Sequence, residues 1–212
     1  MSTLLLRLAG PMQSWGTDSK FEERRTNREP SKSGVLGLVA AAMGIRRQEK
    51  EKLRELTELK FGVIVNREGV MMRDFHTARP EKGSPYVTYR YYLADAVFVV
   101  GLESDNPDLL DKISLALQAP AFPLFLGRRC CPPVGRLLLG ISDKPLKEAL
   151  ESQRTDASTR LVMDADEGEQ GSIVRDVPVS FDPVRREYAY RRVNEIILTS
   201  NVEHDPMAEL EG

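Results

Sequence analysis

Cysteine is almost absent from this sequence of 212 residues, which contains two, the neighbours Cys130 and Cys131. Two adjacent cysteines provide neither a disulfide framework nor the spaced Cys/His pattern of a zinc site. This cysteine usage fits a reducing compartment, so we expect a cytoplasmic protein. We expect no metal site and no cofactor.

Long hydrophobic runs and a large net charge are also lacking. The run Leu4-Leu5-Leu6 has no basic flank before it and is interrupted by Arg7, so we expect neither a signal peptide nor a membrane span. The formal net charge of -2 argues against a generic basic nucleic-acid binder but leaves room for local basic clusters. With 41% hydrophobic residues, the chain is long enough to bury a core.

The clearest helical pattern covers residues 30–45, and both of its ends are marked. Ser31 or Ser33 can cap the first turn, and Gly44 fits the left-handed position that ends a helix. Apolar residues lie on nearly every side, which is typical of a buried helix. The N–H groups of the first turn and the cation of Lys32 predict a site for a phosphate or carboxylate. A capped core helix with a solvated lysine is the alternative.

The order of the elements indicates an α+β fold. Residues 1–142 read as strand, helix, strand, hairpin, strand, helix and strand, which is the split βαβ pattern of a ferredoxin-like domain. Residues 143–212 predict a small β-rich C-terminal part that ends in a frayed tail.

Residues 67–92 predict a long projecting hairpin. Turn signals lie in its middle, and basic and aromatic residues alternate along it. Such interleaving suits a nucleic-acid grip, whereas the alternative is an ordinary polar hairpin with half-packed tyrosines. The candidate contacts are His76, Arg79, Lys82, Tyr86, Tyr89 and Arg90.

Further nucleic-acid contacts are predicted in loops at the ends of strands. The loop at 10–16 holds the only tryptophan, Trp15, which can stack on a base or anchor the core. Three arginines precede the buried helix, and two more follow a glycine near residue 128. The candidate set is Gln13, Ser14, Trp15, Arg24, Arg25, Arg28, Ser31, Lys32, Ser33, Gly127, Arg128 and Arg129.

Four blocks of the sequence carry a resemblance to a known family. They are LRLAGPMQSWG at 6–16, PSKSGVLGL at 30–38, RYYLADA at 90–96 and LGRRCCP at 126–132. In this order they resemble the CasD family of the type I-E Cascade complex, the CRISPR surveillance complex. The last block normally has one cysteine before the proline. The resemblance covers about residues 3–135 and is vague after 143.

The resemblance implies a RAMP-type, RRM-like ferredoxin domain with a hairpin thumb. It further implies a non-catalytic subunit that binds the 5′ handle of the guide crRNA and caps one end of the backbone. Its partners would be the repeated backbone subunit and the large subunit, with target DNA contacted only indirectly. Such a subunit aids target DNA recognition in antiviral defence.

The alternative function is a metal-independent endoribonuclease that processes CRISPR repeat RNA, as in a sister branch of the family. Acid–base cleavage needs a titrating pair within hydrogen-bond reach. The two histidines are His76, in the predicted thumb, and His204, in the tail. Because no Lys-His pair lies on a core strand, we predict RNA binding without catalysis.

Two other patterns are predicted to be without a catalytic role. A P-loop needs its glycines before the Lys-Ser pair, whereas Gly34 and Gly37 follow Lys32. The acidic cluster at 164–169 is most simply a solvated loop.

Overall fold

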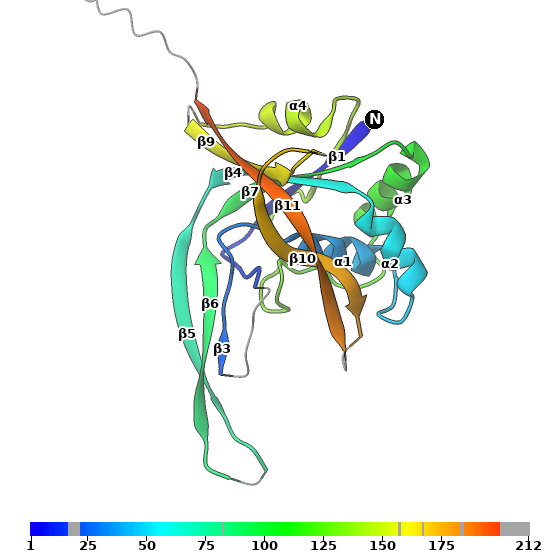
Figure 1. Ribbon diagram of the computed structural model, residues 1–212. Helices are drawn as coiled ribbons and strands as arrows, with labels where there is room; N and C mark the ends of the chain where they lie inside the picture. Colours follow the sequence, from blue (N-terminus) through cyan, green and yellow to red (C-terminus); the bar gives the residue numbers. More distant parts are fainter. Residues whose placement is uncertain (17–21, 82, 157, 167, 183–184, 200–212) are drawn as a thin grey trace, which may run out of the picture.

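The computed structural model describes residues 1–16, 22–81, 83–156, 158–166, 168–182 and 185–199. Within these residues a seven-stranded sheet of order β10-β11-β9-β4-β7-β1-β8 forms the centre (Figure 1). Its strands are β1 (Ser2–Ala9), β4 (Lys60–Arg67), β7 (Val97–Ser104), β8 (Leu138–Ser142), β9 (Ser158–Asp164), β10 (Ser172–Phe181) and β11 (Arg186–Thr199).

One face of the sheet is covered by α1 (Lys32–Ala42) and α3 (Pro107–Gln118), which follow β1 and β7. Because side chains alternate along a strand, Leu4, Leu6 and Leu8 of β1 all enter the core on this face. The predicted caps of α1 are confirmed: the Ser31 hydroxyl accepts a hydrogen bond from the Gly34 N–H, and Gly44 adopts a φ of 71°. The charged helix α2 (Lys50–Thr57) buries only Leu53 and Leu56.

The opposite face of the sheet carries the short helix α4 (Leu146–Glu151). Gly62 of β4 and Gly101 of β7 are register partners beneath it. A Cβ on Gly62 would lie 2.7 Å from Leu150, and one on Gly101 would lie 2.5 Å from Leu146. The paired glycines therefore leave the bare area of sheet on which the two leucines of α4 pack.

The segment after residue 142 continues the same sheet. Strand β9 pairs with β4, β11 pairs with β9, and β10 forms the edge. The sheet is thus continuous across the predicted boundary at 142/143, and α4 covers strands from the first part. A division into two folding units stays a prediction, and the predicted frayed tail lies outside the described residues.

A second sheet combines β2 (Met12–Gln13), β3 (Glu23–Arg24), β5 (Val70–Ala78) and β6 (Tyr86–Ala94). Strands β5 and β6 pair antiparallel, from Val70 opposite Ala94 to Ala78 opposite Tyr86. They form a long hairpin that projects away from the seven-stranded sheet (Figure 1). It lies within the range predicted for a hairpin, and its role as a thumb stays a prediction. None of the described helices is long and apolar enough to cross a membrane.

The two glycines inside α1 predict opposite effects of the same substitution. A Cβ at position 34 would lie 2.8 Å from the ring of the buried Trp15, whereas one at position 37 would lie 3.6 Å from Phe181, an ordinary contact. Gly37→Ala should therefore raise the free energy of unfolding by up to about 1 kcal/mol, the helix propensity difference. Gly34→Ala should lower it, since the ring is fixed in the core. Denaturant unfolding of both variants checks this, and a larger loss for Gly37→Ala would contradict it.

Candidate nucleic-acid interface

The loop at 10–16 is part of the core. The Gln13 amide donates hydrogen bonds to the carbonyl oxygens of Leu8, at 3.2 Å, and Ala96, at 2.8 Å, and its oxygen accepts one from the Trp15 indole. Trp15 is 1% exposed, and the Ser14 hydroxyl is bonded to the Tyr91 carbonyl. The prediction that Gln13, Ser14 and Trp15 contact RNA is therefore wrong, because their polar edges and the indole face are already occupied within the chain.

The N-terminus of α1 does bind a carboxylate, but this carboxylate belongs to the chain itself. The backbone N–H of Lys32 donates to Asp176 Oδ2 at 2.8 Å, and Lys32 Nζ lies 3.1 Å from Asp164 Oδ2. Ser31, Lys32 and Ser33 are all buried. The predicted phosphate contact by these three residues is wrong, because an internal aspartate already fills the anion position.

Arg191 of β11 completes a buried ion-pair network of Lys32, Asp164, Asp176 and Arg191. Its Nε lies 2.6 Å from Asp176 Oδ1, and its Nη1 lies 2.7 Å from Asp164 Oδ1. Burial lowers the pKa of Lys32 from its usual value, and the neighbouring Asp164 opposes this change. Two cations face two anions, so the network is neutral and its members satisfy one another. Asp164 is thus not part of a solvated acidic loop, contrary to the sequence prediction.

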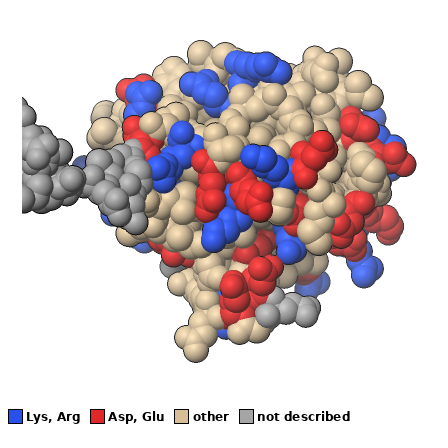
Figure 2. Space-filling view, turned by 90° about the horizontal axis from the view of Figure 1, so that it is seen from above, with Lys and Arg blue, Asp and Glu red and all other residues tan. Residues whose placement is uncertain are grey.

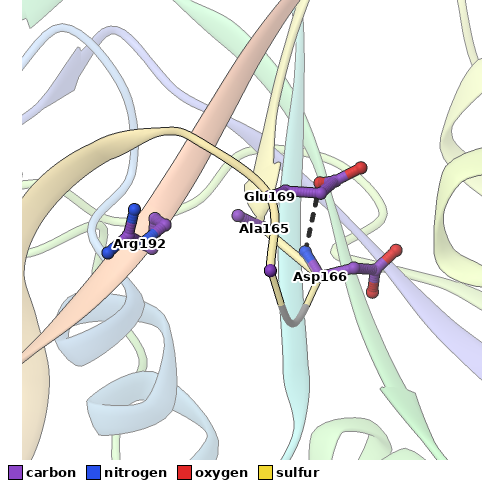
Figure 3. A pocket seen from close by; sticks show the side chains of 5 residues that line it. Ala165, Asp166, Glu169 and Arg192 are labelled. Atoms are coloured by element: carbon purple, nitrogen blue, oxygen red, sulfur yellow. Dashed lines mark hydrogen bonds between the residues drawn. The ribbon is translucent and has the colours of Figure 1, made fainter.

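The rest of the acidic cluster is the turn between β9 and β10. It lines an open hollow of about 440 Å³ with Ala165, Asp166, Gly168, Glu169 and Arg192. Figure 3 shows the Asp166 N–H bonded to the Glu169 carboxylate, at 3.2 Å, while Arg192 lies apart from both on β11. In the described part of the chain, no group of three or more His, Cys, Asp or Glu residues could hold a metal ion.

The loop around Arg128 is held against the second sheet. Arg128 donates to the carbonyl oxygen of Arg24, at 2.7 Å, and its guanidinium lies 4.7 Å from the centre of the Tyr92 ring. Gly127 has a φ of 84°, and a Cβ there would lie 1.7 Å from the Ser14 carbonyl oxygen. Gly127 and Arg128 therefore shape the loop, whereas Arg129 is exposed.

The two cysteines of this loop are free thiols. Cys130 is exposed and Cys131 is buried, with 3.8 Å between their sulfur atoms. Burial raises the pKa of the Cys131 thiol to about 12, so it stays protonated at neutral pH.

The remaining predicted contacts lie at the surface, in β3, in the segment after it and on the β5–β6 hairpin. Arg24, Arg25 and Arg28 are exposed, and Arg25 pairs with Glu23 at 2.9 Å. Of the hairpin set, His76, Arg79, Tyr86 and Tyr89 are exposed, Arg90 is half-buried, and Lys82 lies outside the described residues.

Sequence reasoning missed one aromatic side chain of the hairpin, Phe75. It is 67% exposed and lies opposite Tyr89 in the register. The guanidinium of Arg73, two residues away on the same face, is 5.0 Å from the centre of the Tyr89 ring. The alternation of β5, which places Arg73 and Phe75 on one face, is a signal that could have found them. The face therefore offers exposed rings beside a cation, which suits the stacking of single-stranded bases.

The charge on another part of the surface is mixed. Figure 2 shows Lys and Arg interspersed with Asp and Glu on the face seen from above, over the end of the molecule opposite the hairpin. Such a mixture lacks the single-sign field of a nucleic-acid footprint among the described residues in view. Nucleic-acid contact is therefore better placed at the hairpin and the loops near it.

Comparisons with known proteins agree in pointing to one family. The family model described as CRISPR-associated protein (Cas_Cas5) matches residues 3–194. The chain is 37% identical over 158 residues to the CRISPR system Cascade subunit CasD of Escherichia coli (strain K12), covering 66% of this chain and 70% of that relative.

Two solved structures are similar over nearly the whole chain. A chain of a CRISPR RNA-guided surveillance complex has a TM-score of 0.77 at 35% identity, covering 92% of this chain and 90% of that one. A crystal structure of a Cas protein has a TM-score of 0.75 at 40% identity, covering 93% and 95%.

The buried ion-pair network predicts a structural role for Lys32. Lys32→Met should lower the free energy of unfolding by about 3 kcal/mol, because it leaves a buried carboxylate without its cation. Lys52→Met is the matched control, since Lys52 forms an exposed pair with Glu49, and it should have little effect. Denaturant unfolding measures both. Equal stability of the Lys32 variant and the wild type would show that the network contributes nothing.

Proposed function

Because the chain belongs to the Cas5 family of CRISPR-associated proteins, we propose that it is a non-catalytic subunit of a Cascade-type surveillance complex. In this role it binds the 5′ handle of the guide crRNA, caps one end of the backbone and aids recognition of target DNA in antiviral defence. The similarity to a chain of an RNA-guided surveillance complex over 92% of its length supports this role.

The topology supports a ferredoxin-like, RAMP-type core within residues 1–142. The four strands β4-β7-β1-β8 are antiparallel throughout, and helices follow the first and third of them in chain order. This is the strand and helix order of the split βαβ motif. The β5–β6 hairpin is inserted between the second and third strands, where it serves as the thumb.

The exposed aromatic face of the hairpin is the observation that carries the RNA-binding proposal. Phe75 and Tyr89 lie opposite each other with large exposed fractions, and Arg73 lies over the Tyr89 ring. Exposed rings of this size on a projecting element favour a binding partner over solvent. Bases stack on such rings, and Arg73 and Arg79 supply positive charge for phosphates.

The rest of the surface is available to protein partners. The mixed charges of Figure 2 suit contact with other subunits better than contact with RNA. The repeated backbone subunit and the large subunit are the proposed partners, and target DNA is reached through them. We place the complex in the cytoplasm, in agreement with the two free thiols.

One observation bears on the alternative, a metal-independent endoribonuclease. His76 Nε2 lies 3.0 Å from Asp74 Oδ2, an arrangement that orients an imidazole. Both side chains are nearly half exposed on the hairpin, and no printed contact joins this pair to a second acid or base in the described residues. General acid–base cleavage needs two rigidly placed groups on opposite sides of the scissile phosphate. The binding role is therefore favoured.

Co-expression of the chain with the guide RNA and the other Cascade subunits tests the RNA-binding role. Native mass spectrometry should find the chain in a complex with intact guide RNA. Phe75→Ser/Tyr89→Ser should weaken RNA binding about tenfold, because base stacking contributes about 1–3 kcal/mol per base.

The matched control for this double variant is Ile173→Ser/Tyr190→Ser. Both control residues are 67% exposed, on β10 and β11, away from the hairpin. The control should retain RNA at the wild-type level. If the two double variants lost RNA equally, the hairpin face would not be the binding surface.

Incubation with repeat RNA tests for catalysis directly. The purified chain should leave the RNA intact, with and without divalent metal, because the His76–Asp74 pair has no rigidly placed partner. Cleavage at one site that is abolished by His76→Ala would overturn the non-catalytic role and favour the endoribonuclease.

A further inference from the structure

Arg7 is an unusual side chain for a central strand. Strand β1 lies between β7 and β8, and Arg7 follows three leucines on it. The alternation of β1 places Arg7 on the face of Leu5, away from α1 and α3. In the described part of the chain, no hydrogen bond or ion pair engages its half-buried guanidinium. A guanidinium held in a sheet without a partner is costly unless it binds something.

A second arginine lies at the same end of the sheet. Arg67 ends β4 and is the register partner of Val97, whose other neighbour across β7 is Ala9 of β1. Arg7 and Arg67 therefore approach the start of β7 from both sides. Like Arg7, Arg67 has no ion pair or hydrogen bond from its side chain among the described residues.

The two arginines line a cavity of about 250 Å³, which we call the Arg7–Arg67 pocket. Its other walls are segments 9–11 and 95–97, with Val134. Asp95 is its acidic residue and forms no ion pair in the described structure, so two cations and one carboxylate leave the pocket with one net positive charge. This volume is below that of a typical small-molecule site, and suits a single anionic group better than a cofactor.

The location of the pocket relates it to the hairpin. Asp95 and Ala96 connect β6 to β7, so they form the root of the hairpin, and the Asp95 N–H donates to the Pro11 carbonyl at 3.2 Å. This bond ties the floor of the pocket to the loop at 10–16. A strand of nucleic acid that follows the hairpin to its root reaches the two guanidinium groups.

We propose that the Arg7–Arg67 pocket binds one backbone phosphate of the guide RNA where the strand passes the root of the hairpin. The proposal rests on the RNA-binding function proposed above and adds a site to it. Guanidinium groups present forked donors that match phosphate oxygens, and two of them neutralise one phosphodiester together. The contact fixes the position of the strand and reads no base.

The test compares Arg7→Gln/Arg67→Gln with a control that also removes two charges, Arg47→Gln/Arg54→Gln. Both control arginines are exposed, on the connection into α2 and on α2 itself. Fluorescence anisotropy of the full chain with single-stranded handle RNA and with a scrambled RNA of equal length gives affinity as a function of salt. Thermal unfolding reports the fold of each variant.

The pocket variant should bind both RNAs about tenfold more weakly, to the same extent for each sequence, because a phosphate contact is blind to sequence. The slope of log affinity against log salt should fall in magnitude by about 0.7, the value for one phosphate of a single strand. The control should match the wild type. Arg67→Gln alone changes an exposed residue and should show about a threefold loss, so the test holds even if the double variant unfolds.

Each other outcome overturns a stated part. No RNA binding by the wild-type chain would overturn both the proposed function and the pocket. Wild-type affinity of the folded pocket variants would overturn the pocket alone. A loss confined to handle RNA would assign base recognition instead. Unchanged RNA binding with failed assembly in co-expression would assign the pocket to a carboxylate of a partner subunit.

Discussion

The buried ion-pair network of Lys32, Asp164, Asp176 and Arg191 holds the two halves of the chain together. It joins the N-terminus of α1 to three strands, β9, β10 and β11, and each of its cations faces a carboxylate at 3.1 Å or less. Because the network is neutral and mutually hydrogen-bonded, these charges can lie in the interior. The C-terminal strands are thereby fixed beside the first helix, and they continue the sheet of the N-terminal part.

The sequence blocks that carry the family resemblance meet in space as one packing unit. The Trp15 ring lies against Gly34, Gly127 lies against the Ser14 carbonyl, and a Cβ on Gly10 would be 2.9 Å from the Pro132 carbonyl oxygen. Each close approach requires a residue without a side chain. Most of the distinctive residues of these blocks therefore build the fold, and few of them are free to touch a ligand.

This use of the family blocks moves the nucleic-acid interface elsewhere. The free cations and rings lie on the β5–β6 hairpin, on Arg129 and at the root of the hairpin, and Figure 1 shows the hairpin extending well beyond the sheet. A protein with a net charge of -2 can bind RNA in this way because its basic groups gather on one element while other surfaces mix both signs (Figure 2).

Sequence patterns by themselves determined the features that depend on neighbours along the chain. The Ser31 cap, the left-handed Gly44, the alternating hairpin and the order of strands and helices follow from local backbone preferences and periodicity. The resemblance of the blocks likewise indicated the family. Only the tertiary structure decided which polar groups are internal, because Lys32 and Asp176 are 144 positions apart and nothing local to Lys32 distinguishes an aspartate from a phosphate. The same distance along the chain hid the pairing of Arg7 with Arg67 and the core position of Trp15.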